Sequence, residues 1–284
     1  MIEQARVVDI SRYWRTGGID WQRLKENFDA VIMSAGVGFN RDMLLEEHIG
    51  KSVEYDVPYA TFHIPDPSKD MGEQAQFYAE LPGVKTCKVF GDWEKPYQSG
   101  RLPDQVEFHY YLTALDSYAE QEAAVYSRME IIKRMGSPDY LKERDLWLAQ
   151  YIYEDYGARL QYSLFETFLE KFGMRLPPSV DGTGLEQNVK LWQFTEYGDA
   201  RFYCANRLTS DPKYVYGMTK ADLNVSVDEV STFLAWFGGK QQLDPELEPE
   251  PPLPPVEPCC ICKAWEIVSK LADNAIKNCN CRKD

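Results

Sequence analysis

Short apolar runs recur between residues 6 and 224, and they constrain the fold more than any other feature of the chain. Most are 4–6 residues long and rich in Val, Ile, Tyr, Phe and Trp. Runs of this kind are typical of strands buried on both faces, as parallel strands are. The runs are Arg6–Ile10, Ala30–Ala35, Tyr59–Ile64, Lys88–Phe90, Ala123–Tyr126, Leu146–Tyr151, Lys190–Phe194 and Ala221–Asn224.

Amphipathic segments separate these runs. Residues 20–28, 70–81, 104–119 and 128–135 carry apolar side chains at helical spacing. Strands with interposed helices over this length predict an α/β fold, a β/α barrel of the TIM type or a modified form of it. The aromatic-rich stretch 153–189 favours an insertion or a long loop with one helix.

A segment rich in proline and acid, residues 241–258, marks the clearest boundary in the chain. It contains no basic residue, and such a composition cannot form a core and favours an extended spacer. We therefore predict a globular domain at 1–240, a linker at 241–258 and a helical tail at 259–284.

The tail holds most of the cysteines, which are Cys259, Cys260, Cys262, Cys279 and Cys281. Apolar residues recur at helical spacing between the two cysteine groups. A single short helix cannot bury such a stripe, so we expect docking or self-association, with cell-wall anchoring as the alternative. The sequence leaves open whether these cysteines pair, hold a metal or stay reduced.

Composition argues against several classes of protein. A net charge of −14 without a basic stripe argues against nucleic acid as a partner. No window reaches 18 apolar residues, so the sequence predicts no membrane span. The N-terminus has no Sec-type signal pattern. The three histidines are scattered without ligand spacing, so we expect no metal site in the globular part and no cofactor.

Two acids, Asp92 and Glu94, follow the fourth apolar run with one residue between them. A strand turns alternate side chains to the same side, so the two would point together. Their repulsion raises one pKa and leaves a proton donor beside a carboxylate base at neutral pH. This pair is the minimum equipment for cleaving a glycosidic bond. The same motif is also common in proteins as two solvated acids, so the rest of the chain must show whether this pair is catalytic.

Other candidate strands carry acids and aromatic residues near their ends, where the functional side chains of a barrel lie. Asp9 lies near the end of the first run, and Asp222 lies within the last one. Acids and aromatic faces would then converge on one groove, where rings stack on sugars. Asp9 could instead cap a turn, and Asp222 could belong to an ordinary turn.

Several motifs resemble, in order, those of the family-25 glycoside hydrolases, the lysozymes of the Chalaropsis type. The resemblance covers roughly residues 6–236. Its motifs are Val8-Asp9-Ile10-Ser11, Gly18-Ile19-Asp20-Trp21, Phe28-Asp29-Ala30-Val31-Ile32-Met33, Pro58-Tyr59-Ala60-Thr61-Phe62-His63, Asp92-Trp93-Glu94, Val125-Tyr126-Ser127, Leu146-Trp147-Leu148-Ala149, Trp192-Gln193 and Asp222-Leu223-Asn224. Gly91 departs from the pattern, because a branched apolar residue is more usual before the acids.

The resemblance implies a modified β/α barrel that hydrolyses the β-1,4 bond between N-acetylmuramic acid and N-acetylglucosamine in peptidoglycan. It implies that Glu94 is the general acid and that Asp92 stabilises the transition state or orients the N-acetyl group. Asp9 and Asp222 would be flanking acids. The residues expected to line the groove are Tyr59, His63, Tyr126, Trp147 and Gln193.

We therefore expect a muramidase of phage origin, either a lysis enzyme or a virion component. It would act from the virion or after release from the host cell, and its tail would bind a phage structural protein or a second copy. The alternative is a structural or wall-binding protein on the same barrel that has lost turnover. A barrel chitinase would carry Asp-x-Asp-x-Glu, but Phe90 stands two residues before Asp92.

Overall fold

The structure is a computed structural model. It describes residues 3–12, 18–94, 96, 100–151, 164–172, 176–199 and 220–238. These residues lie in the first of the two units into which the chain divides, Met1–Gln241. The predicted linker at 241–258 and the cysteine-containing tail at 259–284 lie outside the described residues, so the expectations about them stay predictions.

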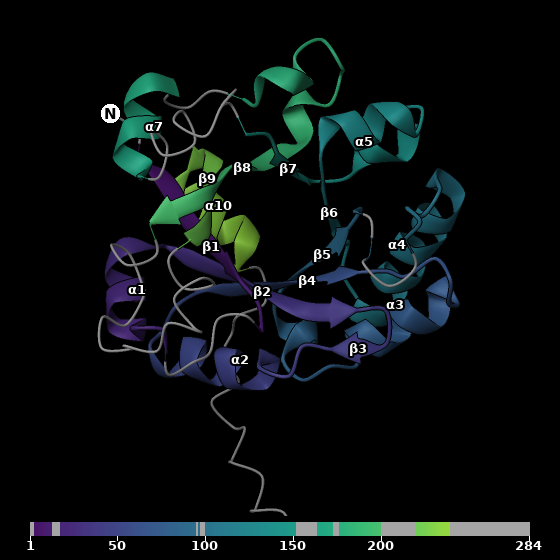
Figure 1. The fold of residues 1–284 in the computed structure, drawn as a ribbon, viewed down its shortest axis with the longest axis horizontal. Coiled ribbons are helices and arrows are strands. Elements are labelled where there is room, and N and C mark those ends of the chain that lie inside the picture. The colour runs from purple at the N-terminus through teal and green to yellow at the C-terminus, as the bar shows by residue number, and fades with distance from the viewer. Residues whose placement is uncertain are drawn as a thin grey trace, which may run out of the picture. The chain divides into compact units, whose positions relative to one another are not determined.

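Eight of the described strands close into a barrel (Figure 1), which confirms the predicted fold class. The order around the barrel is β1-β9-β8-β7-β6-β5-β4-β2, and pairing of β1 with β2 closes it, while β3 extends β2 as a hairpin. The bounds are Gln4–Ile10 (β1), Ala30–Val37 (β2), Asn40–Arg41 (β3), Tyr59–Ile64 (β4), Lys88–Asp92 (β5), Ala124–Ser127 (β6), Leu146–Ala149 (β7), Val189–Asp199 (β8) and Lys220–Glu229 (β9).

The last strand runs in the opposite direction to its neighbours. Strands β1, β2 and β4 to β8 pair in parallel, whereas β9 pairs antiparallel with both β1 and β8. The expectation that the eighth apolar run is a parallel strand is therefore wrong. Because the chain enters β9 from the other end, Asp222 near the start of β9 lies directly opposite Asp9 near the end of β1.

Helices surround the strands on the outside (Figure 1). Asp20, Asp70 and Asp104 cap α1, α3 and α4, and these helices with α5 match the four helical segments predicted from the sequence. The helices α2 and α10 were not predicted. The bounds are Trp21–Asn27 (α1), Leu45–Glu54 (α2), Met71–Ala79 (α3), Gln105–Ala119 (α4), Met129–Arg134 (α5), Phe165–Phe172 (α7) and Val230–Phe237 (α10), with 3-10 turns at Val84–Thr86, Asp139–Glu143, Pro178–Val180 and Glu186–Asn188. Within the described parts of the chain, no helix has the length and apolar character needed to cross a bilayer.

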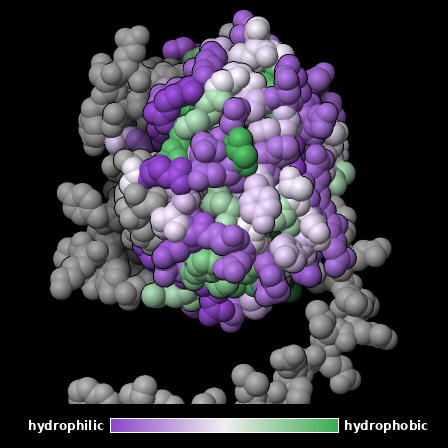
Figure 2. Space-filling view, turned by 90° about the vertical axis from the view of Figure 1, so that its right-hand side faces the viewer, coloured by the Kyte–Doolittle hydropathy of each residue, from purple (hydrophilic) through white to green (hydrophobic). Residues whose placement is uncertain are grey.

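Alternating side chains along the strands divide the buried residues into two cores. One core lies between the barrel and its helices, and the other fills the inside of the barrel. Phe90, Trp147 and Leu191 belong to the inner core, which Phe233 and Phe237 of α10 also join. The outer surface on the side of α3 and α4 is mostly hydrophilic with scattered apolar spots (Figure 2).

The position of Gly91 against α4 explains why a glycine replaces the branched apolar residue that is usual in the family. A Cβ atom at this position would lie 2.6 Å from Cδ2 of Leu112 and 3.3 Å from Cζ of Phe108, both fully buried. We expect Gly91→Ala to lower the free energy of unfolding by about 1–3 kcal/mol, because the buried Leu112 side chain must shift in a packed core. Urea unfolding followed by circular dichroism measures this. The control is Gly50→Ala in α2, where nothing lies within 4 Å of the new Cβ; an equal effect at both glycines would contradict the packing argument.

Candidate active site

Four carboxyl groups gather where the inner core ends, at the carboxyl ends of the parallel strands. Asp9 and Asp92 lie near the ends of β1 and β5, Glu94 follows β5, and Asp222 enters from β9. Asp92 is only 3% exposed, whereas the Glu94 side chain is 28% exposed. The structure thus brings all four sequence-predicted acids into one cluster, with Glu94 on its solvent side.

Trp93 fixes the direction of the two acids beside it. Its side chain points out of the barrel, where Nε1 donates to the carbonyl oxygen of Pro103 (2.9 Å) and the ring stacks on Phe108 at 4.7 Å. Its backbone N–H donates to the carbonyl oxygen of Tyr126 (2.8 Å). Because side chains alternate along an extended segment, anchoring Trp93 outside turns Asp92 and Glu94 inward.

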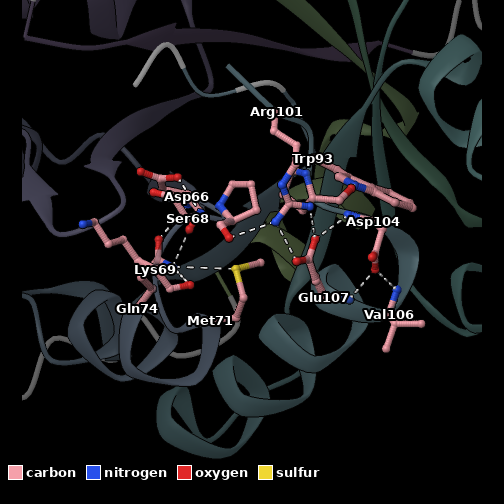
Figure 3. Close-up of polar contacts among 12 residues, drawn as sticks. Asp66, Ser68, Lys69, Met71, Gln74, Trp93, Arg101, Asp104, Val106 and Glu107 are labelled. Atoms are coloured by element: carbon pink, nitrogen blue, oxygen red, sulfur yellow. Dashed lines mark hydrogen bonds and ion pairs between the residues drawn. The ribbon is translucent and has the colours of Figure 1, made fainter. Parts of the chain in front are cut away.

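The helix against which Trp93 packs is itself anchored at its start (Figure 3). Asp104 caps α4 and accepts from the backbone N–H of Val106 and of Glu107 (2.9 Å each). Arg101 donates two bonds of 2.7 Å to Glu107 and one of 2.9 Å to the carbonyl oxygen of Pro67. These contacts tie the segment after β5 to the segment after β4, which stabilises the support behind the acids.

Two amide side chains orient Asp9. Gln193 Nε2 and Asn224 Nδ2 each donate to Oδ2 of Asp9 at 3.0 Å. The amide oxygen of Gln193 accepts from the hydroxyl groups of Tyr126 (2.9 Å) and Tyr151 (2.8 Å). Donors occupy the amide oxygen of Gln193, and Trp147 occupies that of Asn224. The NH₂ groups of both side chains must therefore face Asp9, which holds its carboxyl group in one orientation.

Trp147 supports the same network from inside the barrel. Its Nε1 donates to Oδ1 of Asn224 (2.7 Å), and its side chain is only 1% exposed. Tyr126 and Gln193 are buried as well. These three residues, which were expected to line a groove, contact the acid network instead of presenting exposed faces.

The environment of the cluster favours protonated carboxyl groups. Burial raises the pKa of Asp9 to about 6, and burial together with the nearby Asp9 carboxylate raises the pKa of Asp222 well above its ordinary value. Burial and the charges of Glu94 and Asp9 do the same to the pKa of Asp92. Within the described residues, Oδ1 of Asp92 has no hydrogen-bond partner. The cluster therefore holds carboxyl groups that keep their protons to higher pH than usual, and Oδ1 of Asp92 can contact another molecule.

Glu94 experiences two opposing influences. Burial raises the pKa of its carboxyl group, and the guanidinium of Arg128 opposes this rise. Nε of Arg128 lies 3.1 Å from Oε1 of Glu94, and its guanidinium carbon lies 5.3 Å from the centre of the Tyr151 ring. Arg128, Tyr151 and Asn224 were not among the predicted site residues. Alternation along an extended segment could have placed two of them, because Asn224 stands two residues after Asp222 and Arg128 stands two residues after Tyr126.

Tyr59 and His63 lie elsewhere, and the structure corrects the expectation that they line the site. His63 is fully buried outside the barrel, where Nδ1 accepts from Tyr111 (2.8 Å) and Nε2 donates to the carbonyl oxygen of Gly38 (2.7 Å). The hydroxyl group of Tyr59 donates to the carbonyl oxygen of Gly83 (3.2 Å). Burial lowers the pKa of His63 to about 4, so this residue is neutral and structural.

The Asp222 carboxyl group should make stability depend on pH. Its pKa is raised in the folded protein, so its contribution to stability is full below the unfolded value near ~4 and is lost as pH rises through the folded value. Asn does not titrate, so we expect Asp222→Asn to gain stability over the wild type between pH 4 and pH 8. The gain should grow as pH rises, and urea unfolding at several pH values measures it. A difference that does not change with pH would contradict the shift.

Within the parts of the chain that the structure describes, no group of His, Cys, Asp or Glu side chains is arranged to hold a metal ion. The chemistry that the described site offers is therefore that of carboxyl groups, one guanidinium and the hydroxyl and amide groups that orient them. A β/α barrel with paired carboxyl groups at the carboxyl ends of its strands is the arrangement of a glycoside hydrolase.

Comparison with known proteins places the chain more closely. The sequence profile of the glycosyl hydrolases family 25 matches residues 8–201. The match covers more than half of the chain, so the chain belongs to this family and is a glycoside hydrolase. The resemblance found in the sequence motifs is thereby confirmed. No curated protein sequence matches the chain.

Solved structures share the fold at low sequence identity. A bacterial lysozyme from Streptomyces coelicolor is 13% identical, with a TM-score of 0.59 over 83% of this chain and 98% of that one. A muramidase from Acremonium alcalophilum is 16% identical, with a TM-score of 0.57 over 83% and 99%. The catalytic domain of an endolysin from a Listeria monocytogenes bacteriophage is 17% identical, with a TM-score of 0.55 over 84% and 98%.

Proposed function

We propose that the protein is an N-acetylmuramidase, which hydrolyses the β-1,4 bond between N-acetylmuramic acid and N-acetylglucosamine in bacterial peptidoglycan. Membership of family 25 supports this, as does the likeness to a lysozyme, a muramidase and an endolysin domain. The observation that carries the proposal is the acid cluster, in which Asp92 and Glu94 face the same end of the barrel beside Asp9 and Asp222.

In this proposal Glu94 is the general acid. It is the more exposed member of the pair, and burial raises the pKa of its carboxyl group, so it can carry a proton to the leaving glycosidic oxygen. Asp92 either stabilises the oxocarbenium-like transition state or orients the N-acetyl group, and its Oδ1 is available for this contact. Asp9 and Asp222, hydrogen-bonded to each other, flank the pair and complete its acidic surroundings.

We further propose that the enzyme comes from a bacteriophage and acts on the cell wall from the virion or after release. The likeness to a phage endolysin domain supports this origin. The tail at 259–284 would bind a phage structural protein or a second copy of the chain. Light scattering of the reduced and the oxidised full chain tests self-association, and a monodisperse monomer in both states would exclude it.

The proposed activity is tested by release of reducing sugar ends from purified peptidoglycan. We expect the wild type to release them continuously, because each hydrolysed glycosidic bond exposes one new reducing end. A wild type that is inactive on peptidoglycan from several bacteria, but that sediments with it, would favour the alternative of a wall-binding protein on the same barrel.

A further inference from the structure

Arg128 lies at the centre of the site, although none of the sequence motifs includes it. It follows β6 directly, and β6 lies between β5 and β7 in the barrel. Its side chain therefore reaches Glu94 beyond β5 on one side, at 3.1 Å, and covers the ring of Tyr151 beyond β7 on the other. The Arg128 side chain is 42% exposed, so the pair lies where the buried acids meet solvent.

This ion pair conflicts with the role of a proton donor. A guanidinium within hydrogen-bonding distance favours the ionised form of a carboxyl group, whereas a general acid must carry its proton when substrate binds. The same contact holds the Glu94 side chain in one position, next to the reacting bond in the proposed mechanism. Arg128 thus affects both the position and the protonation of Glu94.

We propose that Arg128 is a positioning residue that holds Glu94 at the end of the barrel and sets the pH above which the enzyme loses its proton donor. The proposal rests on the proposed function, in which Glu94 is the general acid. Arg128 itself does not titrate in the working range, so a change in the pH profile on its removal reports on Glu94.

Other ionisable groups also face the pair. Glu196 of β8 and the hydroxyl groups of Tyr126 and Tyr151 act on Arg128, while Glu196 also acts on Glu94. The charges of the acid cluster also interact with one another: Asp9 and Glu94 act on Asp92, and both act on Asp222. All of these groups remain in an Arg128 variant, so the comparison isolates the guanidinium.

The experiment compares the pH dependence of kcat/KM on soluble peptidoglycan chains for the wild type, Arg128→Met and Arg128→Lys. We expect the basic limb of the Met variant to move up by about one pH unit or more, because removal of a positive charge at this distance raises the pKa of Glu94. The Lys variant keeps the charge and should stay close to the wild type. An unmoved limb in an active Met variant would overturn the proposal.

The chain offers a matched control in Arg6. This residue also pairs with a glutamate, Glu166 at 2.9 Å, and its guanidinium carbon also lies over an aromatic ring, that of Phe165 at 5.4 Å. Arg6 lies on β1 and makes this pair with α7, outside the barrel. Arg6→Met removes the same kind of contact and should leave the pH profile unchanged; an equal shift would overturn the assignment to Arg128.

A second measurement separates this proposal from the proposed function. The carboxyl resonance of Glu94 is titrated by ¹³C NMR in the wild type and in Arg128→Met, with Glu94→Gln to assign it. We expect its midpoint to rise in the Met variant, whether or not the protein cleaves peptidoglycan. No rise would overturn the proposal, and a rise in a protein without activity would leave Arg128 as the partner of Glu94 and refute the muramidase function instead.

Discussion

Glu94→Gln is expected to lower the rate of reducing-end release from peptidoglycan by at least ~100-fold, the contribution of a positioned general acid. Gln keeps the shape of the side chain, and its amide oxygen can take the place of Oε1 of Glu94, which lies 3.1 Å from Nε of Arg128. The substitution removes the proton that Glu94 would donate to the leaving glycosidic oxygen. Circular dichroism should show an unchanged fold, so the loss is one of chemistry.

The control for this variant is Glu166→Gln. Glu166 also pairs with an arginine, but it does so on α7, outside the barrel. We expect it to keep the rate of the wild type. If Glu94→Gln also kept that rate, the general acid would lie elsewhere, and Asp92, the other acid after β5, would be the next to replace.

Trp93→Ala is expected to lower the free energy of unfolding by about 3–5 kcal/mol, as large-to-small changes of buried aromatic residues do. Trp93 is fully buried, stacks on Phe108 at 4.7 Å and donates to the carbonyl oxygen of Pro103. Its removal leaves a cavity between β5 and α4. Urea unfolding followed by circular dichroism measures the loss.

Trp93→Phe distinguishes stacking from hydrogen bonding at this position. Phe keeps an aromatic ring against Phe108 and leaves the carbonyl oxygen of Pro103 without its donor, which costs about 1–3 kcal/mol. We therefore expect a smaller loss of stability than in Trp93→Ala, with peptidoglycan cleavage retained. Equal losses in the two variants would show that packing against Phe108 contributes little.

The sequence predicts the barrel well because its strands are buried on both faces. Such strands appear as short apolar runs, and the observed bounds of β4, Tyr59–Ile64, coincide with the predicted run. The direction of a strand leaves no such trace, because a buried apolar run reads the same either way. This is why the antiparallel course of β9 could not be predicted, although Asp222 was correctly assigned to the acid cluster.

The same double burial explains why the faces of β4 were misjudged. Ala60 belongs to the inner core and Tyr59 to the outer one, but both are buried, so polarity does not tell the two faces apart. Asp92 at the end of β5 and Glu94 after it mark the inner face, because side chains two residues apart in an extended segment point to the same side. Arg128 stands two residues after Tyr126, so alternation predicts its direction, but its contact with Glu94 depends on the pairing of β5 with β6.

The most direct test of the muramidase proposal is to identify the sugar at the new reducing ends. Peptidoglycan digested by the wild type is reduced with borohydride, and the products are analysed by mass spectrometry. Hydrolysis on the reducing side of N-acetylmuramic acid predicts products that end in reduced N-acetylmuramic acid and that are absent from the Glu94→Gln digest. Products that end in reduced N-acetylglucosamine, or products formed equally by both proteins, would contradict the proposed bond or the proposed acid.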